Sequence, residues 1–363
     1  MKSLGRYSLL AAMALGVAGC AQTASLEVWR PAQIDLPGIE RIAVLDFQGL
    51  ENTGQIARSA VSAEMFDNGF YQMVDPAELT GYVAQASATN PPTEGTIRAA
   101  AEAARTMGVD ALLVGDVLKY QVVDDERNHS HVHFINGGGG DFDHGMTDSF
   151  VGVGFENRYV ETREATVALG FRLIDTRSQD VIATRQVSFT QVGQRVNGQG
   201  YIPARETALA AATARCADEI VATLAPHRRP ISVTLAGGGL GKAGSDIRQG
   251  NKLAVAGDWN AAAVHWEAAI ESDAACHAAM HNLALAREAA GDYASARELL
   301  GRAIEIKPKK QYLETKRDID DRERQYRRAM AQHERRSKHE NAAKLEPMSG
   351  VALLPDGPGE FRR

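Results

Sequence analysis

Residues 108–117 read GVDALLVGDV, a nearly continuous apolar run, and a second such run, RIAVLDF, occupies residues 41–47. Runs of this kind are typical of strands that are buried on both faces of a sheet. Apolar residues at helical spacing predict helices at 55–68 and 96–107, and Phe70–Val74 is predicted as a further strand. This alternation of strands and helices indicates a mixed sheet covered by helices.

The pattern changes to strict alternation at residues 164–174, where every second residue from Ala165 is apolar. After a polar turn the alternation resumes at Val181, which predicts an antiparallel hairpin with one buried face. A long alanine-rich helix is predicted at 203–224. The sequence therefore predicts an α+β protein that begins with a mixed α/β sandwich over residues 39–235.

Three segments of this domain follow one another in the order found in a known family. They are the strand at 41–47, the Gly69–Asp75 element and GVDALLVGDV at 108–117. Together they resemble the curli-secretion lipoprotein family (CsgG-like), whose fold is shared with the outer-membrane activator LpoB. The resemblance covers residues 39–230 and implies an outer-membrane lipoprotein that faces the periplasm. It further implies a role in export or envelope assembly, without catalysis.

The first twenty residues resemble a bacterial lipoprotein signal. After a positively charged start, the apolar run Leu9–Val17 is too short to span a bilayer, and small residues precede Cys20. We expect residues 1–19 to be removed, Cys20 to carry lipid and residues 20–38 to form a tether. In such lipoproteins a residue other than Asp after the cysteine, here Ala21, implies the outer membrane. An ordinary signal peptide with a coincidental cysteine is the alternative.

Beyond a glycine-rich segment at 236–246, predicted to be a flexible hinge, the sequence repeats at an offset of 34 residues. The period and residue types predict an all-α module of two tetratricopeptide (TPR) repeats at 247–308. A charged capping helix at 309–346 and a disordered tail at 347–363 complete the chain. The matched pairs are Gly257 and Gly291, Trp259 and Tyr293, Ala262 and Ala296, Trp266 and Leu300, Ala269 and Ala303, and Ile270 and Ile304.

The repeats carry candidate residues for binding a protein or peptide partner. Asn251 and Asn282 resemble the groove-facing asparagines of repeats that hold a peptide backbone, and Lys316 lies beyond them. Ile247 occupies a position that is basic in carboxylate-binding members, so capture of a peptide carboxylate is not expected. Asparagines that only satisfy local backbone groups are the alternative.

Three histidines, His129, His131 and His133, fall at every second position. On a strand their imidazoles would share one face and could bind Zn²⁺, which is the one cofactor that the sequence raises. The sequence favours a mobile polar loop over residues 121–156, with the metal site as the alternative. Another alternative is a membrane-inserted hairpin, but the alternating runs reach about seven residues where a membrane strand needs about nine to eleven.

Composition narrows the function further. The net charge of −6 argues against nucleic acid as the main partner. Cys216 and Cys276 are expected to be free thiols, because two isolated cysteines do not form a disulfide framework. Since no arrangement of nucleophile and base stands out, we expect no enzyme activity.

The predicted function is a protein-binding scaffold, anchored by lipid to the periplasmic face of the outer membrane, in envelope assembly or protein export. Two alternatives stay open at this point. One is an oligomeric CsgG-type secretion-channel subunit, and the other is a periplasmic metal-binding lipoprotein. The oligomeric state stays open as well.

Overall fold

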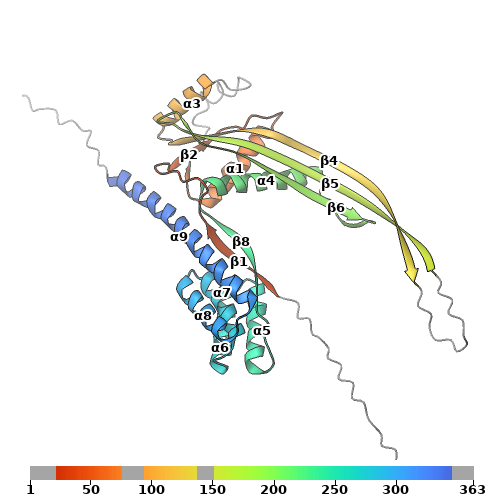
Figure 1. The fold of residues 1–363 in the computed structure, drawn as a ribbon. Helices are drawn as coiled ribbons and strands as arrows, with labels where there is room; N and C mark the ends of the chain where they lie inside the picture. Colours follow the sequence, from red (N-terminus) through yellow and green to blue (C-terminus); the bar gives the residue numbers. More distant parts are fainter. Residues whose placement is uncertain (1–21, 76–93, 137–150, 346–363) are drawn as a thin grey trace, which may run out of the picture. The chain divides into compact units, whose positions relative to one another are not determined.

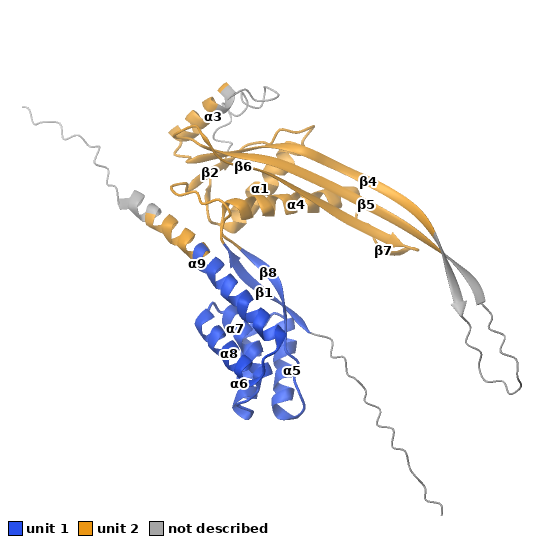
Figure 2. Ribbon diagram, in the orientation of Figure 1, with its two compact units in different colours: residues 1–30, 228–328 blue, residues 31–227, 329–363 orange. Residues whose placement is uncertain are grey.

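The computed structural model describes residues 22–75, 94–136 and 151–345, and its fold is α+β (Figure 1). The chain forms two compact units, each assembled from two separate stretches of sequence (Figure 2). The helical unit comprises residues 1–30 and 228–328, and the sheet unit comprises residues 31–227 and 329–363. These boundaries differ from the predicted domains, because an N-terminal stretch completes the helical unit and a C-terminal stretch completes the sheet unit.

The sheet unit is built on a six-stranded sheet with the order β3-β2-β4-β5-β6-β7. Strand β2 pairs in parallel with β3 and β4, and the pairs from β4 through β7 are antiparallel, which confirms the mixed sheet. The strands are β2 (Arg41–Val44), β3 (Gln72–Met73), β4 (Ala111–Asn136), β5 (Val151–Asp175), β6 (Val181–Val196) and β7 (Gln199–Tyr201).

Helices cover both faces of this sheet. Helices α1 (Thr53–Asn68) and α4 (Arg205–Leu224) pack on one face, and α3 (Glu94–Thr106) packs on the other. The run GVDALLVGDV explains this arrangement, since Leu113 faces the core under α1 and α4 while Leu112 faces α3. A strand buried on both faces needs apolar residues at consecutive positions, as the sequence pattern indicated.

Strands β4 and β5 extend as one long hairpin, which we call the arm, and their register runs from Ala111↔Asp175 to Asn136↔Val151. The predicted hairpin between residues 164–174 and the strand from Val181 is confirmed by the pairing of β5 with β6. The mobile loop predicted for residues 121–156 is wrong at both of its ends, which continue β4 and β5. Unbroken cross-strand pairing compensates there for the polar side chains that suggested a loop.

The helical unit contains a run of helices and a two-stranded ribbon. The ribbon, formed by β1 (Thr23–Arg30) and β8 (His227–Thr234), packs against the helices through one shared apolar core (Figure 2). The helices are α5 (Gly241–Val255), α6 (Trp259–Ser272), α7 (His277–Ala289), α8 (Tyr293–Ile306) and α9 (Lys310–Leu345), of which α9 continues into the sheet unit.

The 34-residue repeat corresponds to two equivalent helix starts. Helices α6 and α8 begin at Trp259 and Tyr293, and each is capped by the aspartate before it. The Asp258 carboxylate accepts from the Ala261 amide at 2.9 Å, and the Asp292 carboxylate accepts from the Ser295 amide at 3.1 Å. The glycine preceding each aspartate has a positive φ, which a glycine adopts without strain. No helix in the described parts of the chain is long and apolar enough to cross a membrane.

Three predicted connecting or projecting segments are instead packed. The tether at 20–38 is wrong for β1, whose alternating Ala24, Leu26 and Val28 are buried in the helical unit. The hinge at 236–246 is wrong because Ala236 is buried and α5 begins at Gly241. The charged helix predicted at 309–346 corresponds to α9, and it packs further along its length than its sparse apolar residues indicated, through Arg322, Gln332 and Arg335. The signal peptide and the tail at 347–363 lie outside the described residues.

One glycine contact tests the packing of the helical repeat. A Cβ added to Gly250 would lie 2.5 Å from Nε1 of the buried Trp266, whereas a Cβ at Gly301 of α8 would meet open space. We expect Gly250→Ala to lower the free energy of unfolding of the helical unit by about 1–3 kcal/mol, because Trp266 must move. Gly301→Ala is the control and should raise it by up to about 1 kcal/mol through helix propensity.

Urea unfolding followed by tryptophan fluorescence measures both effects, because all three tryptophans lie in the helical unit. Equal stabilisation by the two substitutions would contradict the close contact at Gly250.

Candidate functional site

The groove of the helical unit is the first candidate site, and it is occupied by the chain's own ribbon. Side chains of β1, β8 and residues 235–236 are buried among α5 to α9 in one apolar cluster. Polar contacts reinforce this packing at its edges. The Trp259 indole donates to the Ser25 carbonyl at 3.0 Å, and the Gln311 amide donates to the Thr234 carbonyl at 3.0 Å.

Two buried asparagines hold the backbone of Ala236. The Asn282 side chain accepts from the Ala236 amide at 2.7 Å and donates to the Ala236 carbonyl at 3.0 Å. The Asn251 amide group donates to the same carbonyl at 3.0 Å, and its oxygen accepts from Asn282 at 2.8 Å and from the Trp266 indole at 3.2 Å. Every amide group of this cluster therefore has a partner, as buried polar groups require. We call these two residues the asparagine pair.

A buried histidine adjoins the asparagine pair. His281 Nδ1 lies 3.0 Å from the Asn282 oxygen, and Nε2 lies 3.1 Å from the Thr315 hydroxyl. Because an amide oxygen can only accept, Nδ1 carries the proton and Nε2 accepts from Thr315. The ring stacks on Tyr312 with 4.6 Å between centroids. Burial, together with the nearby positive charge of Lys309, lowers the pKa of His281 to about 4.

These contacts change the interpretation of the predicted partner-binding residues. Asn251 and Asn282 do hold extended backbone, but the backbone belongs to the same chain, so they are not open to a partner in this structure. Lys316 is exposed on α9 and is not part of the cluster. Neither His281 nor Thr315 was singled out from the sequence, because an isolated histidine in an alanine-rich helix carries no pattern that marks a buried network.

The histidines of the arm form the second predicted site. All three lie on β4, with His129 opposite Arg158, His131 opposite Glu156 and His133 opposite Gly154. His129 is exposed, whereas the side chains of the other two lie outside the described set. Among the described side chains, no group of three or more potential ligands could hold a metal ion. Zn²⁺ binding by the three histidines stays a prediction.

The two remaining cysteines are free, as expected, and belong to different units. Cys216 is buried under the sheet, where burial raises the pKa of its thiol to about 11. A thiol in this state is a poor nucleophile, which gives no support to cysteine chemistry at this position. Cys20 lies outside the described residues.

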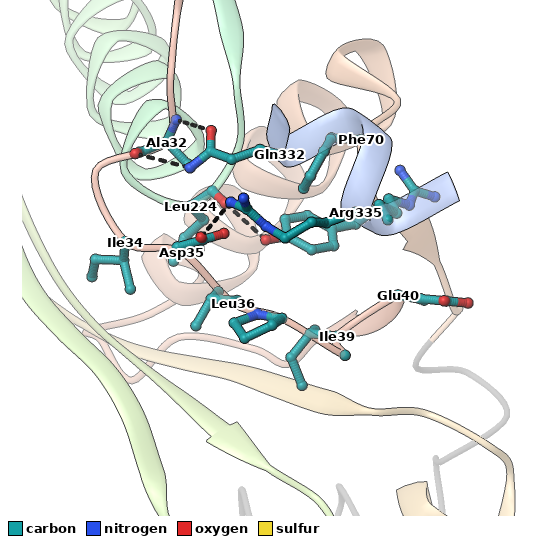
Figure 3. A pocket seen from close by; sticks show the side chains of 14 residues that line it. Ala32, Ile34, Asp35, Leu36, Ile39, Glu40, Phe70, Leu224, Gln332 and Arg335 are labelled. Atoms are coloured by element: carbon teal, nitrogen blue, oxygen red, sulfur yellow. Dashed lines mark hydrogen bonds and ion pairs between the residues drawn. The ribbon is translucent and has the colours of Figure 1, made fainter. Parts of the chain in front are cut away.

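A small pocket of the sheet unit forms where the end of α9 meets residues 32–40 (Figure 3). The Gln332 side chain brackets one peptide unit, accepting from the Ala32 amide at 2.9 Å and donating to the Ala32 carbonyl at 3.4 Å. Arg335 forms an ion pair with Asp35 at 2.5 Å. The Tyr71 hydroxyl donates to the Leu224 carbonyl at 2.8 Å, and burial raises the pKa of Tyr71. Since its polar groups bind one another, the pocket has a structural role.

Comparisons with known proteins add little about function. A family model described as a domain of unknown function (DUF6340) matches residues 248–332. No curated protein matches the sequence. Among solved structures, the PelC dodecamer from Paraburkholderia phytofirmans is similar to 55% of this chain and 97% of that chain, with 14% identity and a TM-score of 0.26.

Lipoprotein GNA1162 from Neisseria meningitidis is similar to 45% of this chain and 87% of that chain, with 14% identity and a TM-score of 0.26. The hypothetical protein CT253 from Chlamydia trachomatis is similar to 42% of this chain and 73% of that chain, with 11% identity and a TM-score of 0.25. At such TM-scores the likeness carries no conclusion about this chain.

The low pKa of His281 predicts that acid destabilises the helical unit. In the unfolded chain, His281 becomes protonated below the ordinary histidine pKa of 6.5. In the folded chain it becomes protonated only below about pH 4. The free energy of unfolding should therefore fall by up to about 3 kcal/mol as the pH drops from 6.5 to 4. The measurement is urea unfolding by tryptophan fluorescence at a series of pH values. His281→Gln should flatten the slope, whereas His265→Gln, on α6, should keep it.

Removal of the Asn282 amide should release the ribbon. Asn282→Ala leaves the Ala236 amide and the Asn251 oxygen without this partner, and we expect a loss of about 2–4 kcal/mol of unfolding free energy. Hydrogen exchange at the Ala236 amide should accelerate in parallel. Lys316→Ala, on the exposed surface, should change stability by less than about 0.5 kcal/mol. Unchanged exchange at Ala236 in the Asn282 variant would contradict the role assigned to the asparagine pair.

Proposed function

We propose that this protein is an outer-membrane lipoprotein, anchored through Cys20, that serves as a protein-binding scaffold in envelope assembly or export. The observation that carries the proposal is the sequence of the first twenty residues, in which the apolar run Leu9–Val17 ends in small residues before Cys20. The resemblance of residues 39–230 to CsgG-like lipoproteins supports the same compartment. Ala21 favours the outer membrane by the sorting rule of bacterial lipoproteins.

The proposed scaffold binds partners through the arm. The helical repeat, which is similar to tetratricopeptide repeats, has its asparagine pair engaged by the chain itself, so we do not propose that groove as the partner site. In the described part of the sheet, β4 beyond Val117 pairs with β5 alone. Its other edge presents backbone amides and carbonyls that a partner strand can satisfy.

The second candidate is an oligomeric secretion-channel subunit. Strands β4 and β5, at 26 and 25 residues, are long enough to cross a bilayer, which favours this candidate. However, charged residues lie on both faces of the described arm, among them Asp124 and Arg163 on the face of α4 and Arg127 and Arg158 on the other. Such a surface does not suit contact with lipid, so the scaffold is the better-supported proposal.

Two measurements on cells test the proposal. Metabolic labelling with a palmitate analogue should mark the wild-type protein and not Cys20→Ser, and mass spectrometry should find acylated Cys20 as the first residue. A photo-crosslinking residue at Val123, which is exposed on β4, should capture a protein partner. The same residue at Val264, exposed on α6, is the control and should capture none. An unmodified Cys20, or equal capture at both positions, would overturn the corresponding half of the proposal.

A further inference from the structure

The chain is fixed on the helical unit from Gln22, its first described residue. The Gln22 carbonyl accepts from the Leu235 amide at 2.8 Å, and its side-chain oxygen accepts from Asn251 at 3.2 Å. Cys20 precedes Gln22 by two residues in the sequence. The proposed lipid on Cys20 would therefore be joined to the helical unit by a very short connection, which would keep that unit close to the membrane surface.

An exposed leucine lies shortly after Leu235, the residue whose amide binds the Gln22 carbonyl. Leu240 is 100% exposed, five residues after Leu235. The segment around it is packed and ordered, since Arg248 donates to the Gly239 carbonyl at 2.8 Å. A Cβ on Gly238 would lie 2.4 Å from the Gly244 carbonyl oxygen. Leu240 is thus held outward by a supported loop at the start of α5.

Basic side chains follow this leucine on α5. Lys242, Arg248 and Lys252 are exposed on this helix, where Asp246 is the one acidic residue and is half-buried. The exposed surface of α5 that follows the leucine is therefore positively charged.

We propose that this face of the helical unit, formed by Leu240, Lys242, Arg248 and Lys252, docks on an anionic phospholipid bilayer. Leu240 inserts between the acyl chains while the three basic side chains bind phosphate groups of the lipid headgroups. The inference rests on the proposed anchoring at Cys20, because that anchor brings the face to the bilayer. An apolar residue within a basic surface is a combination that membrane-surface proteins use to strengthen a lipid anchor.

The test uses the full mature chain carrying Cys20→Ser, so that no lipid modification contributes. Binding is measured by co-sedimentation with vesicles of phosphatidylcholine and phosphatidylglycerol at a ratio of about three to one, and with pure phosphatidylcholine vesicles. We expect binding to the anionic vesicles that weakens with salt, and much weaker binding to the neutral ones. Leu240→Ser should reduce binding about ten-fold, and Lys242→Glu should reduce it about five-fold or more.

Matched controls separate this face from general effects of charge and apolar surface. Arg158→Glu in the arm makes the same charge change as Lys242→Glu, and Val264→Ser removes another exposed aliphatic group of the helical unit. Both controls should bind within about two-fold of the parent. No binding to anionic vesicles, or equal binding by Leu240→Ser, would overturn the inference. Failure of the anchor would appear only in the labelling of Cys20, so the two outcomes are distinguishable.

Discussion

The hydrogen bonds from the asparagine pair to the backbone of Ala236 are the interaction on which the helical unit depends. They are made in the interior, where a peptide group without partners would cost about 1–3 kcal/mol. By satisfying that group, Asn251 and Asn282 allow an extended segment to lie among helices without a neighbouring strand at that residue. The ribbon then contributes Leu26, and the segment after β8 contributes Leu235, to the same core as Trp266 and Tyr312.

The sheet unit also uses a side-chain amide to bind the N–H and C=O groups of a buried residue. Gln332 brackets the peptide of Ala32 as Asn282 brackets that of Ala236, with one acceptor and one donor from a single side-chain amide. Primary amides suit this task because they carry both a donor and an acceptor and no charge, so their burial has no large desolvation cost once the bonds are made.

A charged residue of α9 is buried by another means, as part of an ion pair. Arg322 and Glu288 are buried together as an ion pair, and burial raises the pKa of Glu288 against the effect of Arg322.

The fold could be predicted from the sequence where an element depends on residues close to one another in the chain. Alternation from Ala165 to Leu173 gave the buried face of β5, and the 34-residue offset gave the starts of α6 and α8, because capping by Asp258 and Asp292 acts within one turn. Strand β1 shows the same alternation in Ala24, Leu26 and Val28, but neighbouring prolines favoured a tether. The partners of Asn282 could not be predicted, since Ala236 is 46 residues away and alanine carries no signal of what its backbone binds.

The discontinuous composition of both units has a consequence for biogenesis. Strand β1 precedes its partner β8 by about two hundred residues. Closure of so long a loop is slow because its entropic cost precedes any stabilising contact. An apolar strand must therefore stay unpaired while the intervening domain folds, which makes the newly synthesised chain dependent on chaperones that shield such segments from aggregation.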